Sequence, residues 1–595
     1  MANFAICIDG DAERRRRYIE VAKRRLSLFG GLRTDGMAAA DFNVAWAAGA
    51  RAPVAHYSDD DGLALILGEM ITTGGDLDPE TLRLHWSEPA AERIRADFDG
   101  YYAACVYRPS QRLLVGADLL GMFPVYYHAS PDVLLVGSSP ETFACHPRFR
   151  GAFNPAGLVG ILLTNGLFDG ETLYCGVKRL SPGHLLLWEP GAPARELPRY
   201  RAPLSDRYLD LSFSNHLDIL DQAMTAAMTR HAPPRRTYSL LLSGGLDSRT
   251  VGGYLRKAGR DVTALTFGTR ADIEVRCARP VARVLDMPLR VREIDPARYP
   301  DYARVHTTWE HCASGGSLMM QWGMCEHVTH IPPSCASGLG LDWVLGGHAP
   351  TIPDVSFDDF FRYQNAWGLA PDQLQGLLRR DVFCDAVDGT LERIRATYTG
   401  YADVESRRAW SFALNHRLRF HIGSEAWKLT FAAWPVLPIL DKELLEVGGG
   451  LPPASAADRR AQIELLRTRF PELAELPVDR NAPDTTPLQP RLRWLLARRL
   501  LAPARRLRGA LARRGWKPPE RRRYYRIFDI NGPGWVAVRR EAETCRDLGY
   551  AFFERKALDD LLPAPDVVIR CRDGITDVAG IKTVMAFLLW AKDHL

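Results

Sequence analysis

The sequence of 595 residues has no long hydrophobic run and no paired cysteines. No stretch approaches the roughly 18 consecutive apolar residues that a membrane-spanning helix needs. The eleven cysteines are scattered without any Cys-x-x-Cys pair, which argues against a disulfide framework and favours free thiols in a reducing compartment. The N-terminal apolar stretch precedes its charged residues, whereas a secretory signal has the reverse order. We therefore expect a cytoplasmic protein.

The sequence also has little excess charge, with 76 Lys+Arg against 71 Asp+Glu and a net charge of +5. This balance argues against a dedicated nucleic-acid binder. Residues 491–595 nevertheless hold 23 Lys+Arg against 12 Asp+Glu, so the rest of the chain is mildly acidic. The basic segment suits an anionic membrane surface or an acidic partner, and equally a packed helix with a solvated basic face.

The distribution of apolar residues divides the chain into three predicted regions. Residues 1–205 contain β-rich runs separated by Pro, Gly and Ser, and they end in a Pro-rich polar stretch. Residues 206–490 begin with strands that alternate with helices, a pattern that predicts parallel βαβ units in a doubly wound sheet, and continue as mostly helix. Pro280 is expected to kink or split one of these helices. Residues 491–595 are predicted to form a basic, partly amphipathic extension.

The strongest motif is the loop Ser243–Ser248, with sequence SGGLDS, between an apolar strand and a helix. Its two glycines allow a tight turn, and the N–H groups at the start of the helix suit phosphate oxygens. Asp247 adds a carboxylate for Mg²⁺, which prefers oxygen ligands. The Gly-Lys-Ser/Thr element of a Walker loop is absent. A purely structural glycine turn is the alternative.

A second glycine-rich loop, Ala336–Asp342, follows another short apolar run. Two carboxylates from two loops can share one Mg²⁺ on a triphosphate, so Asp342 is predicted to join Asp247 as a metal ligand. The alternative is a turn closed by a capping aspartate.

These motifs, in this order, resemble the asparagine synthetase and β-lactam synthetase superfamily over residues 1 to about 490, and SGGLDS resembles the loop of N-type ATP pyrophosphatases. Four further segments carry the resemblance: Asp97–His128, Leu173–Trp188, Ser337–Gly347 and Val436–Glu446. The resemblance implies a glutaminase-like (Ntn-type) β-sandwich flanked by helices, an ATP-pyrophosphatase (PP-loop) synthetase domain with a doubly wound parallel sheet, and the helical basic extension.

The resemblance also implies a site that binds ATP and Mg²⁺. The implied nucleotide-binding residues are Ser243, Gly244, Gly245, Leu246, Asp247, Ser248, Thr266, Phe267, Ser337, Gly338 and Gly340, with Asp247 and Asp342 on the metal. Family members use a downstream lysine to stabilise the adenylation transition state. Arg480 is our candidate for that role and Lys442 the second choice, while a solvated loop charge is the alternative for Arg480.

Departures from the family pattern narrow the predicted function. Glutamine-hydrolysing members use a cysteine at residue 2, which is Ala2 here, and Cys7 lies inside a predicted strand. Without a thiolate there is no acyl-enzyme route to ammonia, so the amine is expected to come from the substrate. Leu339 stands where asparagine synthetases carry Glu and β-lactam synthetases carry Tyr. With the C-terminal extension, these departures favour similarity to lasso-peptide cyclases.

That resemblance implies adenylation of an Asp or Glu side chain in a ribosomal precursor peptide, release of pyrophosphate, and attack by the peptide's N-terminal amine with loss of AMP. Implied partners are the precursor peptide, a leader-peptide protease and a leader-recognition protein. The alternatives are an amidotransferase using free ammonia, a β-lactam-synthetase-like ligase acting on a small carboxylate, and a non-catalytic scaffold.

Overall fold

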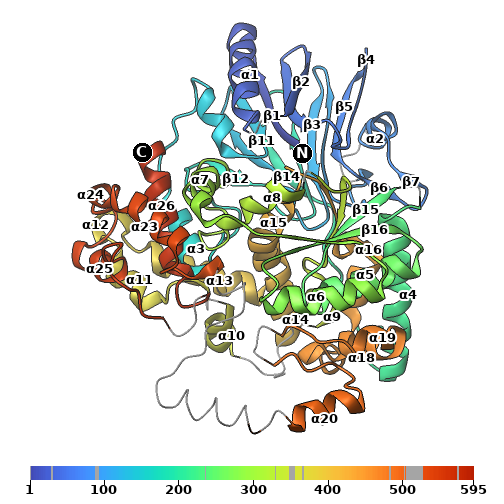
Figure 1. The fold of residues 1–595 in the computed structure, drawn as a ribbon. Coiled ribbons are helices and arrows are strands. Elements are labelled where there is room, and N and C mark those ends of the chain that lie inside the picture. Colours follow the sequence, from blue (N-terminus) through green and yellow to red (C-terminus); the bar gives the residue numbers. More distant parts are fainter. Residues whose placement is uncertain are drawn as a thin grey trace.

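The computed structural model describes residues 2–28, 31–87, 93–234, 236–328, 330–346, 356–364, 367–480, 484–500, 503, 527–571 and 575–595. The N-terminal part is a sandwich of two antiparallel six-stranded sheets (Figure 1). The first has the order β12 (Val177–Arg179), β10 (Tyr126–Ala129), β11 (Val133–Gly137), β1 (Ala2–Asp9), β3 (Phe42–Gly49) and β2 (Leu32–Ala39). The second has the order β14 (Arg195–Pro198), β13 (His184–Trp188), β9 (Arg112–Ala117), β8 (Tyr102–Arg108), β5 (Gly62–Gly68) and β4 (Val54–Asp59). A small hairpin, β6 (Ile71–Thr72) and β7 (Gly75–Asp76), follows β5.

Alternation along β1 shows how this sandwich forms, because successive side chains of a strand point to opposite faces. Phe4 and Ile6 share a buried core with the facing sheet. Ala5 and Cys7 belong to a second core with α1 (Ala12–Leu26) and α3 (Pro155–Thr164). The predicted glutaminase-like sandwich flanked by helices is confirmed.

A five-stranded parallel sheet follows, in the order β17 (Leu289–Arg292), β16 (Asp261–Phe267), β15 (Thr237–Leu241), β18 (Ser334–Ala336) and β19 (Trp434–Val436). The chain runs outward from β15 on one side, then returns to add strands on the other. This order confirms the predicted doubly wound sheet. In such sheets ligands bind at the carboxyl ends of the strands where the order reverses, here between β15 and β18.

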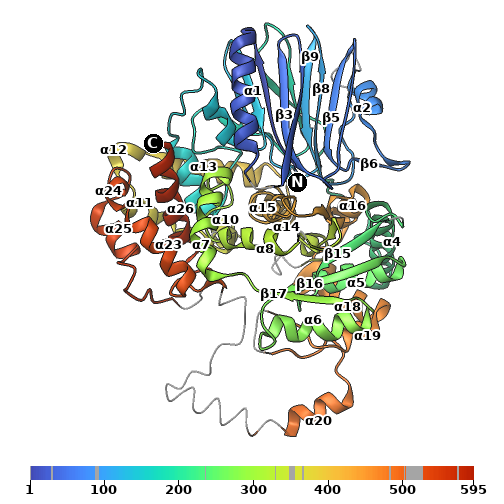
Figure 2. The same cartoon turned by 45° about the horizontal axis from the view of Figure 1, so that its top comes forward.

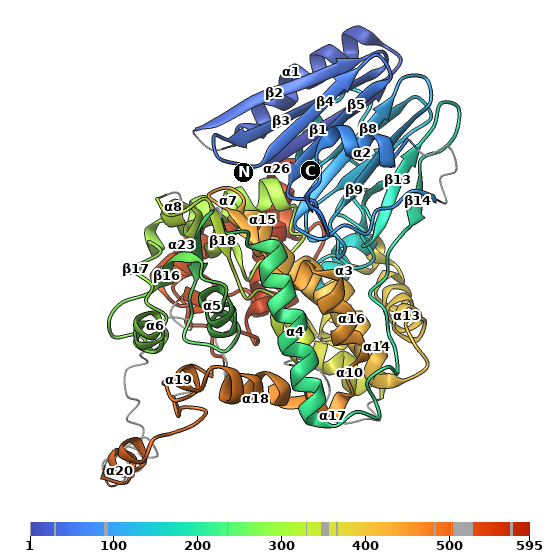
Figure 3. The ribbon, with the colours of Figure 1, turned by 90° about the vertical axis from the view of Figure 1, so that its right-hand side faces the viewer.

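Helices α4 (Phe213–His231), α5 (Asp247–Lys257) and α6 (Ile273–Val284) accompany the first strands of this sheet (Figure 3). Pro280 lies inside α6, which runs on as one helix, so of the two expected effects, a kink or a split, the split does not occur. Val275, Ala278 and Val281 form the buried face of α6. Burial of this apolar face offsets the one backbone hydrogen bond that a proline removes.

Further helices lie between residues 79 and 474. They are α2 (Pro79–His85), α7 (Tyr299–Val305), α8 (Trp322–Val328), α9 (Leu341–Leu345), α10 (Phe357–Gln364), α11 (Pro371–Leu377), α12 (Arg380–Phe383), α13 (Ala386–Thr399), α14 (Glu405–Ala413), α15 (Gly423–Leu429), α16 (Lys442–Gly450), α17 (Pro453–Ala456), α18 (Arg460–Arg469) and α19 (Pro471–Ala474). Two π-helical segments, His306–Glu310 and Leu414–Ile422, interrupt the series.

The C-terminal part contains α20 (Leu492–Leu500), α23 (Pro533–Glu543), α24 (Arg546–Gly549), α25 (Arg555–Leu561) and α26 (Ala579–His594). Helix α26 is buried over most of its length and packs against α3, α23 and α24 (Figure 2). The extension is helical as predicted, but its last helix completes a core begun by the N-terminal sandwich. Most of the basic run between residues 501 and 526 lies outside the described residues.

Among the described residues, no helix is both long enough and apolar enough to span a membrane. The division of the chain at residues 205 and 490 stays a prediction.

Candidate functional site

The two predicted glycine-rich loops meet at the carboxyl ends of β15 and β18, where the strand order reverses. A cavity of about 290 Å³ opens there. Its lining residues are Leu241, Ser243, Asp247, Ser248, Ser337, Gly338, Leu339, Gly340, Asp342, Trp343, Arg417 and Ile422. A Cβ atom on Gly338 would lie 2.8 Å from the Asp247 Cβ and 2.9 Å from the Ser248 backbone nitrogen. Only glycine therefore allows the loops to approach so closely.

The first loop has the features of a phosphate site. Its turn is held from within, because the Ser243 N–H donates to the Ser248 hydroxyl and the Gly245 N–H donates to the Ser243 hydroxyl, each at 3.1 Å. Helix α5 then begins at Asp247 with no side-chain cap. The first N–H groups of a helix lack intrahelical partners and favour anions. The N-terminal start of α5 is thus suited to phosphate oxygens, the role that the sequence predicted for it.

The Asp247 and Asp342 carboxylates converge as predicted, and a guanidinium lies between them. Arg459 Nη1 contacts both Asp247 carboxylate oxygens at 3.0 Å, and its Nη2 lies 3.2 Å from Asp342 Oδ2. Gln462 Nε2 donates to Asp247 Oδ1 at 2.8 Å. Burial raises the pKa of Asp247, an effect that Arg459 opposes and Asp342 reinforces. No local motif in the sequence points to Arg459 or Gln462.

The residues present fit Mg²⁺ and a nucleotide triphosphate. Two carboxylates from separate loops face one cavity, and such hard oxygen donors are the ligands that Mg²⁺ shares with phosphates. Thr266, at the end of β16, is buried, and its hydroxyl has no hydrogen-bond partner among the residues that the structure describes. Phe267 beside it is also buried. An unsatisfied buried hydroxyl next to an aromatic ring suits the edge of an adenine base.

The two predicted cations have different surroundings. Lys442 points to the N-terminal sandwich, where its Nζ lies 2.6 Å from Asp97 Oδ2, and it is not among the residues that line the cavity. Arg480 is exposed and does not line the cavity either, but it follows Asp479, whose N–H donates to the Gly244 carbonyl at 2.9 Å. The structure therefore places Arg480 beside the phosphate loop and Lys442 away from it.

Arg417 is a cavity-lining cation that the sequence did not reveal. It lies on the π-helical segment Leu414–Ile422, with its guanidinium 4.9 Å from the centre of the Trp367 ring. A π-helical turn widens the helix and commonly marks a functional site. No local sequence motif announces it.

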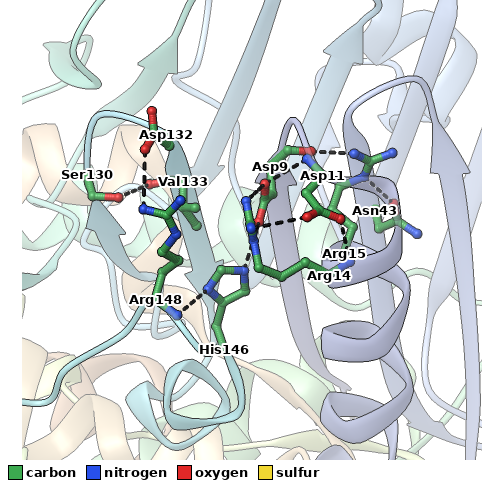
Figure 4. Close-up of polar contacts among 10 residues, drawn as sticks. All are labelled: Asp9, Asp11, Arg14, Arg15, Asn43, Ser130, Asp132, Val133, His146 and Arg148. Atoms are coloured by element: carbon green, nitrogen blue, oxygen red, sulfur yellow. Dashed lines mark hydrogen bonds and ion pairs between the residues drawn. The ribbon is translucent and has the colours of Figure 1, made fainter.

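Polar side chains in the N-terminal sandwich form a separate, internally satisfied cluster at the end of β1 (Figure 4). Asp9 is fully buried and accepts from Arg14 Nη2 at 2.6 Å and from the Asp11 N–H at 2.9 Å, while His146 Nε2 lies 3.2 Å from its carboxylate.

Two residues before Asp9 on β1, burial raises the pKa of the Cys7 thiol to about 12. A thiol in that state is not a nucleophile at neutral pH.

Comparison with known proteins agrees with this architecture. Residues 68–200 match a glutamine amidotransferase domain, and residues 219–477 match the asparagine synthase family. The two matches support a relationship to the asparagine synthetase superfamily, whose members include ATP-dependent ligases.

One curated relative is the carboxyethyl-arginine beta-lactam-synthase of Streptomyces clavuligerus. It is 26% identical over 196 residues, which are 32% of this chain and only 34% of that protein.

Two solved structures show weaker likeness. An allosteric regulatory enzyme of purine biosynthesis has a TM-score of 0.24 and 9% identity, covering 49% of this chain and 80% of its own. A glutamine phosphoribosylpyrophosphate amidotransferase from B. subtilis has a TM-score of 0.23 and 11% identity, covering 49% and 81%. TM-scores this low carry no conclusion about this chain.

Proposed function

We propose that the protein is an ATP-dependent cyclase that closes the macrolactam ring of a lasso peptide. In this proposal it adenylates an Asp or Glu side chain of a ribosomal precursor peptide and joins it to the peptide's N-terminal amine, releasing pyrophosphate and AMP. The supporting observation is the convergence of the two glycine-rich loops and their aspartates on one cavity that also contains the apolar Leu339.

The residues of the chain have distinct parts in this reaction. The N–H groups at the start of α5 would hold phosphate oxygens, and Asp247 and Asp342 would hold Mg²⁺, which supplies positive charge against the leaving pyrophosphate. Activation must precede amide formation because a carboxylate is a poor electrophile. Leu339 has no proton to exchange, so the attacking amine must arrive as the free base or lose its proton to another group. The remaining task is to hold the peptide so that its amine meets the acyl carbon.

We further propose that the amine comes from the peptide rather than from glutamine. β1 begins at Ala2, where the resemblance leads us to expect a nucleophilic cysteine. Cys7 and Cys105, on the strands of the sandwich, are buried with pKa values raised to about 12. The same proposal includes a cytoplasmic location and two partner proteins, a leader-peptide protease and a leader-recognition protein.

The test is reconstitution with precursor peptide, protease, leader-recognition protein, ATP and Mg²⁺. We expect a product lighter by one water than the trimmed core peptide, formed together with AMP. The matched control replaces Asp342 with Asn, which keeps size and shape but removes a metal ligand, and should abolish the product. Absence of the dehydrated mass in a mixture where the protease has cut the precursor would refute the proposal.

A second candidate is a ligase that activates a small carboxylate, favoured by the partial match to a beta-lactam-synthase. Ammonia-dependent amidation of a small acid, or its intramolecular ring closure, without any precursor peptide would establish this candidate in place of the cyclase.

A further inference from the structure

Arg459 occupies the space between the two carboxylates that are suited to the metal. One terminal nitrogen of its guanidinium, Nη1, contacts both carboxylate oxygens of Asp247. The other, Nη2, contacts a carboxylate oxygen of Asp342. The three side chains come from three separate elements, the starts of α5 and α18 and the short helix α9. A cation and two carboxylates have therefore been brought together by the tertiary fold.

The backbone that carries Arg459 has an uncommon conformation. Asp458 has φ 55° and Arg459 has φ 60°, so two successive non-glycine residues lie in the left-handed region. L-residues rarely adopt this conformation, and they keep it only where surrounding contacts hold them. One anchor is the Arg459 N–H, which donates to the Gly346 carbonyl at 3.4 Å. The others are the ion pairs, so the turn aims Arg459 at the carboxylates.

Gln462, one turn into α18, fixes the arrangement from the buried side. It is fully buried, its Nε2 donates to Asp247 Oδ1, and its Oε1 accepts from Arg459 Nη1 at 3.3 Å. The Arg459 side chain itself is 29% exposed on the open side of the cluster. The carboxylate of Asp247 is thus held by a fixed amide, while the guanidinium is a long side chain with access to solvent.

The guanidinium and Mg²⁺ compete for these carboxylate oxygens. Mg²⁺ requires its oxygen ligands at about 2.0–2.1 Å, and both oxygens of Asp247 already face Arg459. Without a counter-ion, two neighbouring carboxylates repel each other. The Arg459 guanidinium supplies one positive charge between them, and a metal ion would supply positive charge at the same place.

We propose that Arg459 is a displaceable counter-ion that takes the place of Mg²⁺ in the nucleotide-free enzyme and is exchanged for it when Mg²⁺·ATP binds. The exchange keeps the two aspartates oriented between turnovers. It also makes free divalent metal bind weakly, because the metal must compete with a tethered guanidinium. Once displaced, Arg459 lies next to the phosphates, and a planar guanidinium binds phosphate oxygens well. The inference rests on the ATP and metal site of the proposed function, but not on which carboxylate is activated.

The test measures Mn²⁺ binding to the nucleotide-free protein. The electron paramagnetic resonance signal of free Mn²⁺ reports how much of the metal stays unbound. Removing a positive charge a few ångströms from the metal should tighten binding, so R459A is expected to bind Mn²⁺ roughly tenfold more tightly than the wild type. R459K keeps the charge and should stay near the wild type. R460A is the matched control, since the neighbouring Arg460 packs over the Phe213 ring instead.

Unchanged or weaker Mn²⁺ binding by R459A, in protein whose circular dichroism matches the wild type, would overturn the inference. If R459A does not fold, R459Q provides the same comparison with a side chain that retains hydrogen bonding. Because the measurement uses no peptide, acid or nucleotide, it can succeed when every cyclase assay fails. Equal loss of Mn²⁺ binding in D247N and D342N shows that the metal measured is the one at this site.

Discussion

At the scale of single residues, the site depends on carboxylates that are held charged within a partly closed cavity. Asp247 begins α5 and contacts both Arg459 and Gln462. D247N retains the shape of the side chain but cannot ligate Mg²⁺ as an anion. We expect Mg²⁺·ATP to bind at least roughly tenfold more weakly, a loss of about 1.4 kcal/mol or more, as measured by calorimetry.

D458N is the control for D247N, because Asp458 is exposed and asparagine tolerates its left-handed backbone. Wild-type affinity in D247N would mean that the nucleotide binds without this carboxylate.

The two candidate cations at this scale can be separated by substitution. Lys442 and Asp97 form an ion pair that is 34% and 26% exposed, and such partly exposed pairs contribute at most about 1 kcal/mol. K442M should therefore cost little stability, and because Lys442 does not line the cavity, the variant should leave turnover unchanged. R480A, beside the phosphate loop, should lower kcat at least roughly tenfold with little change in ATP affinity, if its charge acts on the transition state. Steady-state kinetics and a binding isotherm on both variants decide between them.

The sequence could predict the residues of the two loops because glycine, serine and aspartate carry their chemistry within six or seven positions. It could not predict Arg459 or Gln462, which reach Asp247 from more than 200 positions away along the chain. For the same reason it did not reveal that Lys442 is engaged by Asp97, a partner 345 positions distant. Contacts set by tertiary packing leave no local signature.

At the scale of elements, periodicity predicted the strands and helices around the phosphate loop, and proline misled at one point. Leu217, Leu220, Met224 and Met228 recur at helical spacing and are buried in α4. Pro280 suggested a kink or a split, and the split does not occur, because α6 is continuous. A local propensity is only a weak prior when a buried apolar face holds a helix in place.

The end of α26 is attached to the N-terminal part by a buried carboxylate. His594 Nε2 lies 3.0 Å from Glu141, which also faces His311, and Arg25 lies 3.2 Å from its other oxygen. Burial would raise the pKa of Glu141, but the two histidines outweigh it and lower the value to about 2. Burial also lowers the pKa of His311 to about 4, so that imidazole is neutral at pH 7.

This attachment predicts a pH-dependent effect of E141Q. A carboxylate with a lowered folded-state pKa contributes stability above its unfolded value near 4.5, and this contribution is lost as the pH falls towards 2. E141Q should therefore lower stability at pH 7 by about 1–3 kcal/mol, the range for a buried hydrogen-bonded group that loses its partner, and the gap from the wild type should narrow below about pH 4.5. Urea midpoints across pH measure it. E13Q, at an exposed glutamate, should show no such gap.

At the scale of the whole molecule, α26 joins parts of the chain that lie far apart in sequence. Trp590 is fully buried, its ring lies 5.4 Å from Tyr174, and its Nε1 donates to His311 at 2.7 Å. Thr583 donates to Asn165, the C-cap residue that follows α3, at 2.9 Å. The sequence indicated a basic tail, because Lys and Arg outnumber Asp and Glu in residues 491–595. The apolar residues of α26 do not by themselves reveal which core they enter.

Trp590 offers a test of this connection. W590A should cost about 3–5 kcal/mol, as deletions of buried aromatic side chains do. Hydrogen exchange followed by mass spectrometry should show lost protection in α3 and near His311, as well as in α26. L500A, at a residue of α20 that is 81% exposed, should change none of these. Loss of protection confined to α26 would mean that the helix docks without supporting the rest.

The burial of α26 also has a consequence for biosynthesis. Helix α3 ends at Thr164, and the helix that covers it begins at Ala579, 415 residues later. At about 5–20 residues per second, a ribosome needs roughly 20–80 s to make the intervening chain. During that interval the apolar face of α3 has emerged without its partner. Production of this protein should therefore depend on chaperones that shield nascent chains, and fall when translation is slowed between the two helices.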